Sequence, residues 1–233
     1  MTVALSVVIP AYQEARNIEE LLPLLLSVLE SMNITFEILI VDTPEPMDDT
    51  QSVCESFAVP NLRYLRRDEG FSFGSAVRSG IKHARGTFVI FMDGDGSHHP
   101  EFLRTLYESR ELADVVVASR YIKGGNTDNS LVLKLMSLLV NFVYRIVFSL
   151  DCMDVSNSFK LYRLEMLRKI RLVSENFDII EEILIKLRRS YPKLTIKELP
   201  FYFRNRKHGK TKRNLFVFAF SFMATIIRLV VLK

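Results

Sequence analysis

Four short apolar runs, separated by stretches long enough to form helices, constrain the fold of this chain more than any other feature. The runs are rich in Val and Ile and cover residues 4–9, 36–41, 87–92 and 114–119. Short β-branched runs that alternate with helix-length segments are typical of a mostly parallel sheet with helical crossovers. The sequence therefore predicts an α/β domain in which helices flank a mostly parallel central sheet.

Five segments between and after these runs are predicted to be helices. The first begins with Asn17 as its N-cap, and Pro23 should kink it or alter its first turns. The other four cover residues 49–57, 74–84, 101–111 and 178–190. The chain has 233 residues, of which 48% are hydrophobic, so it is long enough for one large α/β domain with a sizeable core.

Cysteine content and the first residues indicate a reduced protein that faces the cytosol. Cys54 and Cys152 lie far apart in the sequence and lack the spacing of a metal site. The opening MTVALSVVIP has neither a basic region nor a small-residue cleavage site. We therefore expect it to be a first strand rather than a signal peptide.

Basic residues are concentrated in one short stretch, although the formal net charge is only +4. The stretch lies between residues 204 and 213 and contains Arg204, Arg206, Lys207, Lys210, Lys212 and Arg213. Such a cluster predicts a local anionic partner.

Residues 131–150 form the first of two segments that explain the high mean hydropathy of +0.15. Polar residues recur there at steps of three or four and form one narrow stripe on an otherwise apolar helix. The stripe consists of Lys134, Ser137, Asn141, Arg145 and Ser149. This pattern fits either an amphipathic helix in a membrane interface or a buried core helix.

Residues 215–232 form the second apolar segment and directly follow the basic stretch. The segment is near the minimum of roughly 17 to 20 residues that a spanning helix needs. Its basic flank fits the positive-inside tendency. Arg228 leaves open whether the segment spans the membrane or lies partly inserted in it, but we favour membrane attachment.

Polar stretches follow three of the predicted strands, namely PAYQE, VDTPEPMDD and DGDGSHH. In open α/β sheets, ligands bind beyond the carboxyl ends of the strands. We therefore expect these three stretches to meet at one crevice.

The third stretch contains a candidate metal site. Asp93 and Asp95 flank Gly94 and can present carboxylate oxygens to Mg²⁺ or Mn²⁺, although an ordinary turn is the alternative. His98 and His99 are adjacent and have no third nitrogen or sulfur ligand nearby, which disfavours zinc.

Seven motifs, taken in order, resemble the inverting nucleotide-sugar glycosyltransferases of GT-A fold. They are VVIPAYQEARNI, VD, FGSAVRSGIKHARG, MDGDGSHHP, ASRYIKGG, DVSNSFKLYR and FRNRKHGKTK. Within that group they resemble the dolichyl-phosphate mannose synthase branch, which glycosylates polyprenyl phosphates. The resemblance implies a GT-A catalytic domain over residues 1–212, with the interface helix 131–150 inside it. Residues 213–233 would be a C-terminal membrane-associated helix.

The resemblance also implies a donor site and a metal site. The matching donor-binding positions are Pro10, Ala11, Tyr12, Glu14, Asp42, Asp93 and Gly94. Asp93 and Asp95 match the family's metal ligands, so the expected cofactor is Mg²⁺ or Mn²⁺, and Ser97 stands where some relatives have a Gln that assists the ion. Thr43 replaces the second acid of a pair that grips the base and ribose, which leaves the nucleotide open.

The acceptor in this branch is itself a phosphate, whose ionised oxygen needs no general base. The resemblance implies that Asp95, Arg120 and Arg206 are catalytic. The positions implied for the acceptor phosphate are Lys134, Ser137, Arg206 and Lys212. Attraction to anionic lipid headgroups is an alternative role for the basic stretch. Glu181 and Glu182 lie near the base of other enzymes of this fold, but surface charge on a helix explains them equally well.

The implied activity is transfer of mannose from GDP-mannose to a dolichyl or polyprenyl phosphate with inversion. One alternative is a UDP-sugar donor that carries glucose, N-acetylglucosamine or a modified sugar. Another is a catalytically reduced subunit that binds ligands for a partner, which Thr43 favours. The expected partners are nucleotide-sugar, polyprenyl phosphate, membrane lipid and a membrane-anchoring protein, not nucleic acid. We expect a membrane-associated enzyme with its active site on the cytoplasmic face.

Overall fold

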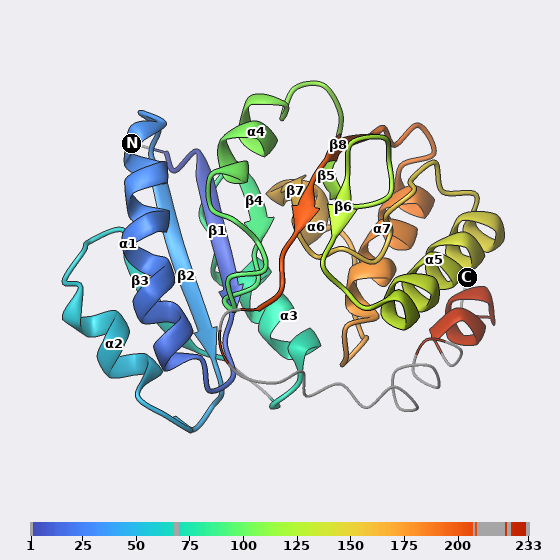
Figure 1. Cartoon of the computed structure of the whole chain (residues 1–233). Helices are drawn as coiled ribbons and strands as arrows, with labels where there is room; N and C mark the ends of the chain where they lie inside the picture. The colour runs from blue at the N-terminus through green and yellow to red at the C-terminus, as the bar shows by residue number, and fades with distance from the viewer. Residues whose placement is uncertain (1, 68–69, 207, 209–221, 223–224, 232–233) are drawn as a thin grey trace.

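A seven-stranded sheet forms the centre of the computed structural model, which describes residues 2–67, 70–206, 208, 222 and 225–231 (Figure 1). The strand order is β3-β2-β1-β4-β7-β5-β8. The strands are β1 (Leu5–Pro10), β2 (Phe36–Asp42), β3 (Leu62–Arg66), β4 (Phe88–Phe91), β5 (Val115–Ser119), β7 (Lys160–Arg163) and β8 (Ile196–Pro200). β7 runs antiparallel to both of its neighbours, and the other pairs are parallel. The predicted mostly parallel sheet is confirmed.

Helices cover both faces of this sheet. They are α1 (Ala15–Ser31), α2 (Thr50–Ser56), α3 (Phe73–His83), α4 (Phe102–Glu108), α5 (Leu131–Phe148), α6 (Leu164–Arg168) and α7 (Ile179–Ser190). Two further short strands, β6 (Asn126–Thr127) and β9 (Tyr202–Phe203), pair with each other in parallel. The four apolar runs became β1, β2, β4 and β5, and the four later predicted helices became α2, α3, α4 and α7.

The start of α1 differs from the prediction that Asn17 is its N-cap. The helix begins at Ala15 after the N-cap Glu14, whose carbonyl accepts a hydrogen bond from the N–H of Ile18 at 2.8 Å. Asn17 lies inside the first turn, where its Nδ2 donates to the Glu14 carboxylate at 2.5 Å. Pro23 lies within the helix, which continues past it.

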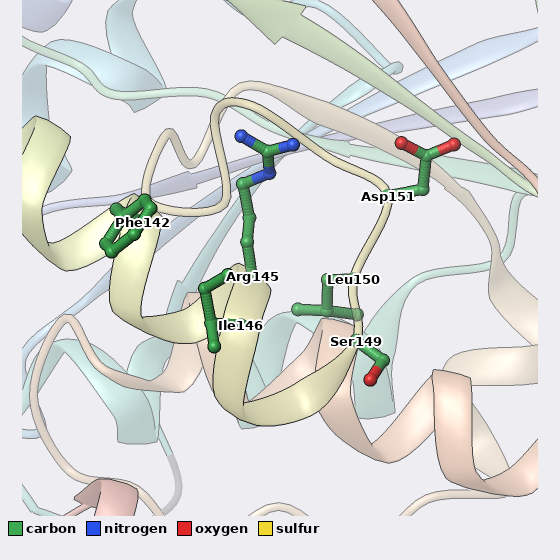
Figure 2. A pocket seen from close by; sticks show the side chains of 6 residues that line it. All are labelled: Phe142, Arg145, Ile146, Ser149, Leu150 and Asp151. Carbon is green, nitrogen blue, oxygen red and sulfur yellow. The ribbon is translucent and has the colours of Figure 1, made fainter.

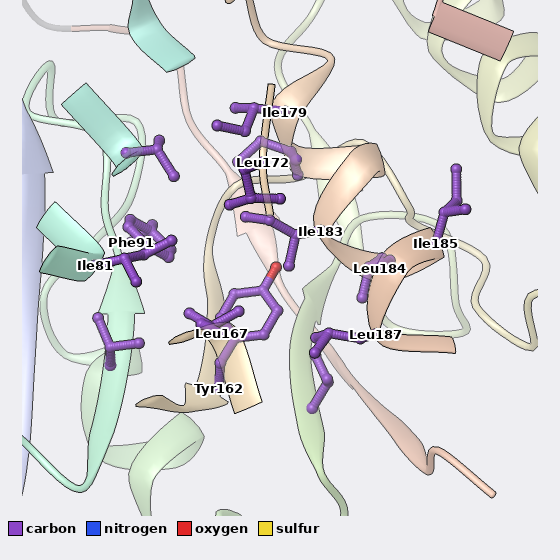
Figure 3. Packing of buried hydrophobic residues seen from close by; sticks show 14 of the residues in the cluster. Ile81, Phe91, Tyr162, Leu167, Leu172, Ile179, Ile183, Leu184, Ile185 and Leu187 are labelled. Atoms are coloured by element: carbon purple, nitrogen blue, oxygen red, sulfur yellow. The ribbon is translucent and has the colours of Figure 1, made fainter. Parts of the chain in front are cut away.

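The hydrophobic core has one layer on each face of the sheet, because successive side chains of a strand point to opposite faces. Val8 of β1 packs in one layer, while its neighbours Val7 and Ile9 pack in the other. Figure 3 shows the first layer, where Ile183 and Leu187 of α7 lie near Tyr162 of β7. These two layers hold the carboxyl ends of the strands in place.

Helix α5 turns most of its polar stripe inward and its apolar face outward, while Ser149, just past its end, is exposed. Asn141 and Tyr144 are buried, whereas the apolar side chains opposite them are exposed. The exposed set includes Leu131, Val132, Leu135, Leu139, Phe142 and Ile146. Within the described residues, α5 is also the one helix whose length and hydropathy would allow it to cross a membrane. Because so little of α5 is buried, it is not a core helix, and it fits a membrane-associated one.

The described part of the predicted segment 215–232 lies beside α5 (Figure 1). The ring of Phe222 meets the Tyr144 ring edge-on at 5.8 Å. Residues 225–231 are helical, and Arg228 lies 3.5 Å from the Asp178 carboxylate at the start of α7. Arg228 therefore has a partner within the protein. Lys212 and the other residues of 215–232 lie outside the described residues. The predicted boundary between a catalytic domain that ends at residue 212 and a C-terminal helix therefore stays a prediction.

Candidate active site

The two aspartates of the DGDGSHH stretch lie just beyond the end of β4, and their side chains are held by neighbouring hydroxyl groups. Asp95 accepts hydrogen bonds from the backbone N–H and the hydroxyl of Ser97, at 3.0 and 2.6 Å. Asp93 accepts one from the hydroxyl of Ser158 at 3.0 Å. A Cβ at Gly94 would lie 3.2 Å from side chains of Ile9 and Ile18, so the close packing of this loop favours glycine.

The side chain of His98 holds the backbone of the same loop through a hydrogen bond. Its Nδ1 accepts the N–H of Asp93 at 3.0 Å, so the ring proton lies on Nε2, which faces Asn157 Oδ1 at 3.2 Å. The ring is buried and stacks on Phe159. Burial lowers the pKa of His98, which keeps it neutral. Both ring nitrogens are therefore engaged within the protein, and His98 supports the loop.

The carboxylates of Asp93 and Asp95 have the donor chemistry that Mg²⁺ and Mn²⁺ prefer. Among the residues that the structure describes, no three His, Cys, Asp or Glu side chains form a group that could hold a metal ion. A cation bound by these two aspartates would take its remaining ligands from substrate oxygens or water, as Mg²⁺ commonly does.

Arg206 reaches this loop from the segment that follows β9. Its Nη2 lies 3.1 Å from Asp95 Oδ2, and the N–H of Arg204 donates to the carbonyl of Ser97 at 3.2 Å. The segment 204–206 thus crosses the aspartate loop and brings a cation to it. The structure brings together two of the three residues predicted to be catalytic, Asp95 and Arg206.

Arg120 lies at the end of β5 and is held by a buried ion pair. Asp154 accepts hydrogen bonds from its backbone N–H, Nε and Nη2, at 2.7 to 2.8 Å. Burial alone would lower the pKa of Arg120, but the Asp154 carboxylate raises it above its ordinary value. Burial would likewise raise the pKa of Asp154, and the pairing lowers it. Both groups therefore stay charged.

Arg120 also connects the inner side of α5 with the rest of the site. Its Nη2 lies 3.3 Å from the hydroxyl of Ser137. The ring of Phe203 lies 5.5 Å from its guanidinium and 5.5 Å from the ring of His98. Lys134, predicted with Ser137 for the acceptor phosphate, is half-buried one turn earlier on α5.

The predicted donor-binding residues lie at the ends of β1 and β2. Pro10 ends β1, and Ala11 is buried and donates its N–H to the carbonyl of Val41 at 2.9 Å. Tyr12 and Glu14, on the turn before α1, are half-buried. All four lie at the carboxyl edge of the sheet, as expected.

Asp42, also predicted to bind the donor, is only 1% exposed. One of its carboxylate oxygens accepts the N–H of Thr43 at 2.7 Å, and the other accepts the hydroxyl of Tyr64 at 2.9 Å. Thr43 donates its own hydroxyl to the carbonyl of Glu45 at 2.6 Å. The Asp42 carboxylate therefore stabilises the turn after β2 by these hydrogen bonds. Its contact with a nucleotide stays a prediction.

Arg67 is a residue that the sequence did not single out. It is 3% exposed, and its guanidinium donates to the carbonyls of Asp42, Ser72 and Ala11, at 3.0, 2.8 and 2.5 Å. It therefore joins the ends of β1 and β2 to the start of α3. No sequence pattern distinguishes Arg67 from its neighbour Arg66, because the two differ in burial, which only the fold determines.

The sequence of residues 6–171 matches the profile of glycosyl transferase family 2. The chain belongs to this family. It is 33% identical over 211 residues to a dolichol-phosphate mannosyltransferase of Pyrococcus furiosus, with 89% of this chain and 58% of that relative covered. It is 31% identical to an undecaprenyl-phosphate mannosyltransferase of Micrococcus luteus (88% and 85% covered). It is 29% identical to a polyprenol monophosphomannose synthase of Mycolicibacterium smegmatis (88% and 79% covered).

Solved structures of glucosyl-3-phosphoglycerate synthase from Mycobacterium tuberculosis resemble this family 2 chain. One, in complex with Mn²⁺, UDP and glucosyl-3-phosphoglycerate, superposes with a TM-score of 0.72 at 18% identity and covers 98% of this chain and 78% of its own. Another, in complex with Mg²⁺ and UDP, gives a TM-score of 0.71. This likeness concerns the fold, and the GT-A fold expected for the chain is confirmed.

The sequence left open that Glu181 and Glu182 are surface charges on a helix. In the structure of this family 2 chain, they are not. Glu181 and Glu182 are 1% and 0% exposed, because the first turn of α7 packs against the sheet. Burial would raise the pKa of Glu182, but hydrogen bonds from Lys186 and from the backbone N–H groups of Ser174 and Val173 lower it. Glu182 therefore binds the loop before α7.

A separate open hollow of about 350 Å³ lies at the C-terminal end of α5 (Figure 2). It is lined by Phe142, Arg145, Ile146, Ser149, Leu150 and Asp151. None of the predicted site residues lines it. The hollow is therefore separate from the predicted site residues at the carboxyl edge of the sheet.

Proposed function

We propose that this chain transfers one mannose from GDP-mannose to a dolichyl or other polyprenyl phosphate, with inversion at the anomeric carbon. One observation carries the proposal: Arg120 lies against Ser137 on the inner side of α5, while the other side of that helix exposes Leu135 and Leu139. A guanidinium, a group whose geometry suits phosphate oxygens, thus lies directly behind a lipid-compatible helix face. The relatives named as mannosyltransferases of polyprenyl phosphates support the same reaction.

The donor diphosphate would lie at the aspartate loop. Asp93 and Asp95 would hold Mg²⁺ or Mn²⁺ there, and such an ion neutralises a departing nucleoside diphosphate. Ser97 and Ser158 fix the two carboxylates by hydrogen bonds, and His98 fixes the backbone between β4 and the loop. The chain therefore presents oxygens that are already oriented before the donor binds.

The acceptor phosphate would lie between this loop and α5. Arg120, Arg206, Lys134 and Lys212 would bind its oxygens, with Ser137 beside them. One ionised phosphate oxygen forms the new bond to the anomeric carbon while the bond from that carbon to the nucleoside diphosphate breaks. No proton has to be removed from the acceptor, so the site needs cations rather than a general base.

Membrane association would come from the exposed face of α5 and from the basic stretch 204–213. Burial of apolar side chains in the bilayer interface contributes the larger part, and basic residues near anionic headgroups add about 1 kcal/mol each. The active site would then face the cytoplasm, where nucleotide-sugars are made. A membrane-anchoring partner would add to this attachment.

A panel of radiolabelled donors tests this proposal. The purified protein in lipid vesicles receives GDP-mannose, UDP-glucose or UDP-N-acetylglucosamine, together with Mg²⁺ and a short polyprenyl phosphate, and the lipid extract is counted. We expect label from GDP-mannose, and none when the acceptor is the same polyprenol without its phosphate. If only a UDP-sugar labels the lipid, that UDP-sugar is the donor and GDP-mannose is not. Absence of label from every donor would favour a binding subunit.

A further inference from the structure

The segment Asp154–Ser158 contacts both halves of the proposed active site. Asp154 and Ser156 bind Arg120, on the acceptor side. Asn157 and Ser158 bind His98 and Asp93, on the donor side. The sequence motif DVSNS contains all of these residues, and the function proposed above uses only Ser158 of it, as a support for Asp93.

On the acceptor side, Asp154 fixes the plane of the Arg120 guanidinium. The carboxylate is fully buried and accepts from Nε and Nη2 as a fork, while Ser156 accepts from Nη2 at 2.9 Å. Nη1 has no hydrogen-bond partner among the residues that the structure describes. The arrangement therefore leaves one edge of the guanidinium for an oxyanion.

On the donor side, Ser158 and Asn157 hold the aspartate loop. The hydroxyl of Ser158 donates to Asp93 Oδ1 at 3.0 Å, and Asn157 holds the ring of His98 on the loop backbone. Asn157 Nδ2 donates in turn to the carbonyl of Ala118 at 2.6 Å, next to the end of β5. One segment thus orients the side chain of Asp93 and supports its backbone.

The segment is itself anchored from three directions. Glu198 of β8 accepts the N–H groups of Met153 and Asp154, at 2.7 and 2.9 Å. Asn141 of α5 accepts the N–H of Ser156 at 3.0 Å. The buried amine of Lys160 in β7 donates to the carbonyl of Val155 at 2.9 Å and to that of Asn157. Backbone held this way cannot shift without breaking several buried hydrogen bonds.

We propose that Asp154–Ser158 is a positioning segment that sets the distance between the acceptor phosphate and the donor diphosphate. Asp154 orients Arg120 toward the acceptor, and Ser158 orients Asp93 toward the cation. Transfer requires the two reacting atoms to be held close and aligned, so a rigid link between their binding groups contributes directly to the rate. The inference rests on the proposed function, because it uses the acceptor role of Arg120.

Two substitutions should each weaken the binding of a different ligand. In Asp154→Asn, the amide can no longer accept both guanidinium bonds, so the KM for polyprenyl phosphate should rise roughly ten- to a hundred-fold, with little change in the KM for the donor. In Ser158→Ala, the Kd of Mn²⁺, measured calorimetrically with the nucleoside diphosphate of the donor present, should rise roughly two- to ten-fold. The acceptor KM of that variant should stay unchanged.

Glu37→Gln is the matched control for Asp154→Asn. Glu37 is also a buried carboxylate that pairs with an arginine, Arg63, and accepts a backbone N–H, but it lies at the amino end of β2. If Asp154→Asn fails to fold, Ser156→Ala removes a single bond to Arg120 and should raise the acceptor KM alone.

Three results would overturn the inference. They are an unchanged acceptor KM in Asp154→Asn and Ser156→Ala, equal changes in donor and acceptor KM in those variants, and an unchanged Mn²⁺ affinity in Ser158→Ala. If the wild type transfers no sugar, the proposed function fails instead, and the Mn²⁺ titration still decides the role of Ser158.

Discussion

Replacing Arg67 by Met should destabilise the protein and loosen the donor site together. The substitution keeps most of the side-chain length but removes the donors to the carbonyls of Ala11, Asp42 and Ser72. Asp42 and Ser72 keep a second donor, from the N–H groups of Arg67 and Ala76, so the loss falls mainly on Ala11. A buried carbonyl without a partner costs about 1–3 kcal/mol, and the two weakened bonds add about 1 kcal/mol.

We therefore expect the free energy of unfolding to fall by about 2–4 kcal/mol, measured by urea denaturation. Affinity for the nucleoside diphosphate should fall as well, because the ends of β1 and β2 are no longer tied to α3. Arg66→Met is the control, since Arg66 is exposed and its guanidinium donates an exposed hydrogen bond to Gln51 at 2.9 Å. It should change stability by less than about 0.5 kcal/mol. Equal effects of the two substitutions would refute the reasoning.

Three further predictions concern the site and the membrane. Asp95→Asn should lower transfer by orders of magnitude while circular dichroism shows an intact fold, and full activity of this variant in excess EDTA would contradict the metal role. Arg206→Lys should keep vesicle flotation but lower transfer roughly ten- to a hundred-fold, because Lys cannot reproduce the paired donors of a guanidinium. Unchanged transfer with weaker flotation would mean that Arg206 binds lipid headgroups alone. Leu139→Glu should weaken flotation at least ten-fold with little change in Tm, since the side chain is 65% exposed, whereas Leu112→Glu, at 67%, should leave flotation unchanged.

Local sequence patterns were sufficient to predict the parallel part of the sheet and most of its helices. Strands β1, β2, β4 and β5 are buried on both faces, so they are predominantly apolar runs in the sequence. β3 and β8 contain charged side chains because they lie at the two edges of the sheet, and no apolar run marks them. β7 includes the buried Lys160, whose polar partners come from backbone carbonyls that only the fold supplies.

Site residues were predictable where a short motif carries the chemistry, as at Asp93 and Asp95. Arg67, Asp154 and Ser158 were not predictable, because their roles depend on burial and on partners distant in the sequence. The sequence also did not predict that most of the polar stripe of α5 points inward. Periodicity shows that a helix has a polar side, but not whether that side faces water or a buried network.

The most direct test of the proposed function is the mass spectrum of the lipid formed from GDP-mannose and a short polyprenyl phosphate in vesicles that contain the wild-type protein and Mg²⁺. We expect the mass of one hexose residue to be added to the polyprenyl phosphate, with the anomeric configuration inverted relative to the donor when the product is examined by NMR. The same lipid should be absent in the Asp95→Asn reaction. Polyprenyl phosphate of unchanged mass, with GDP-mannose left intact or only hydrolysed, would contradict the assignment.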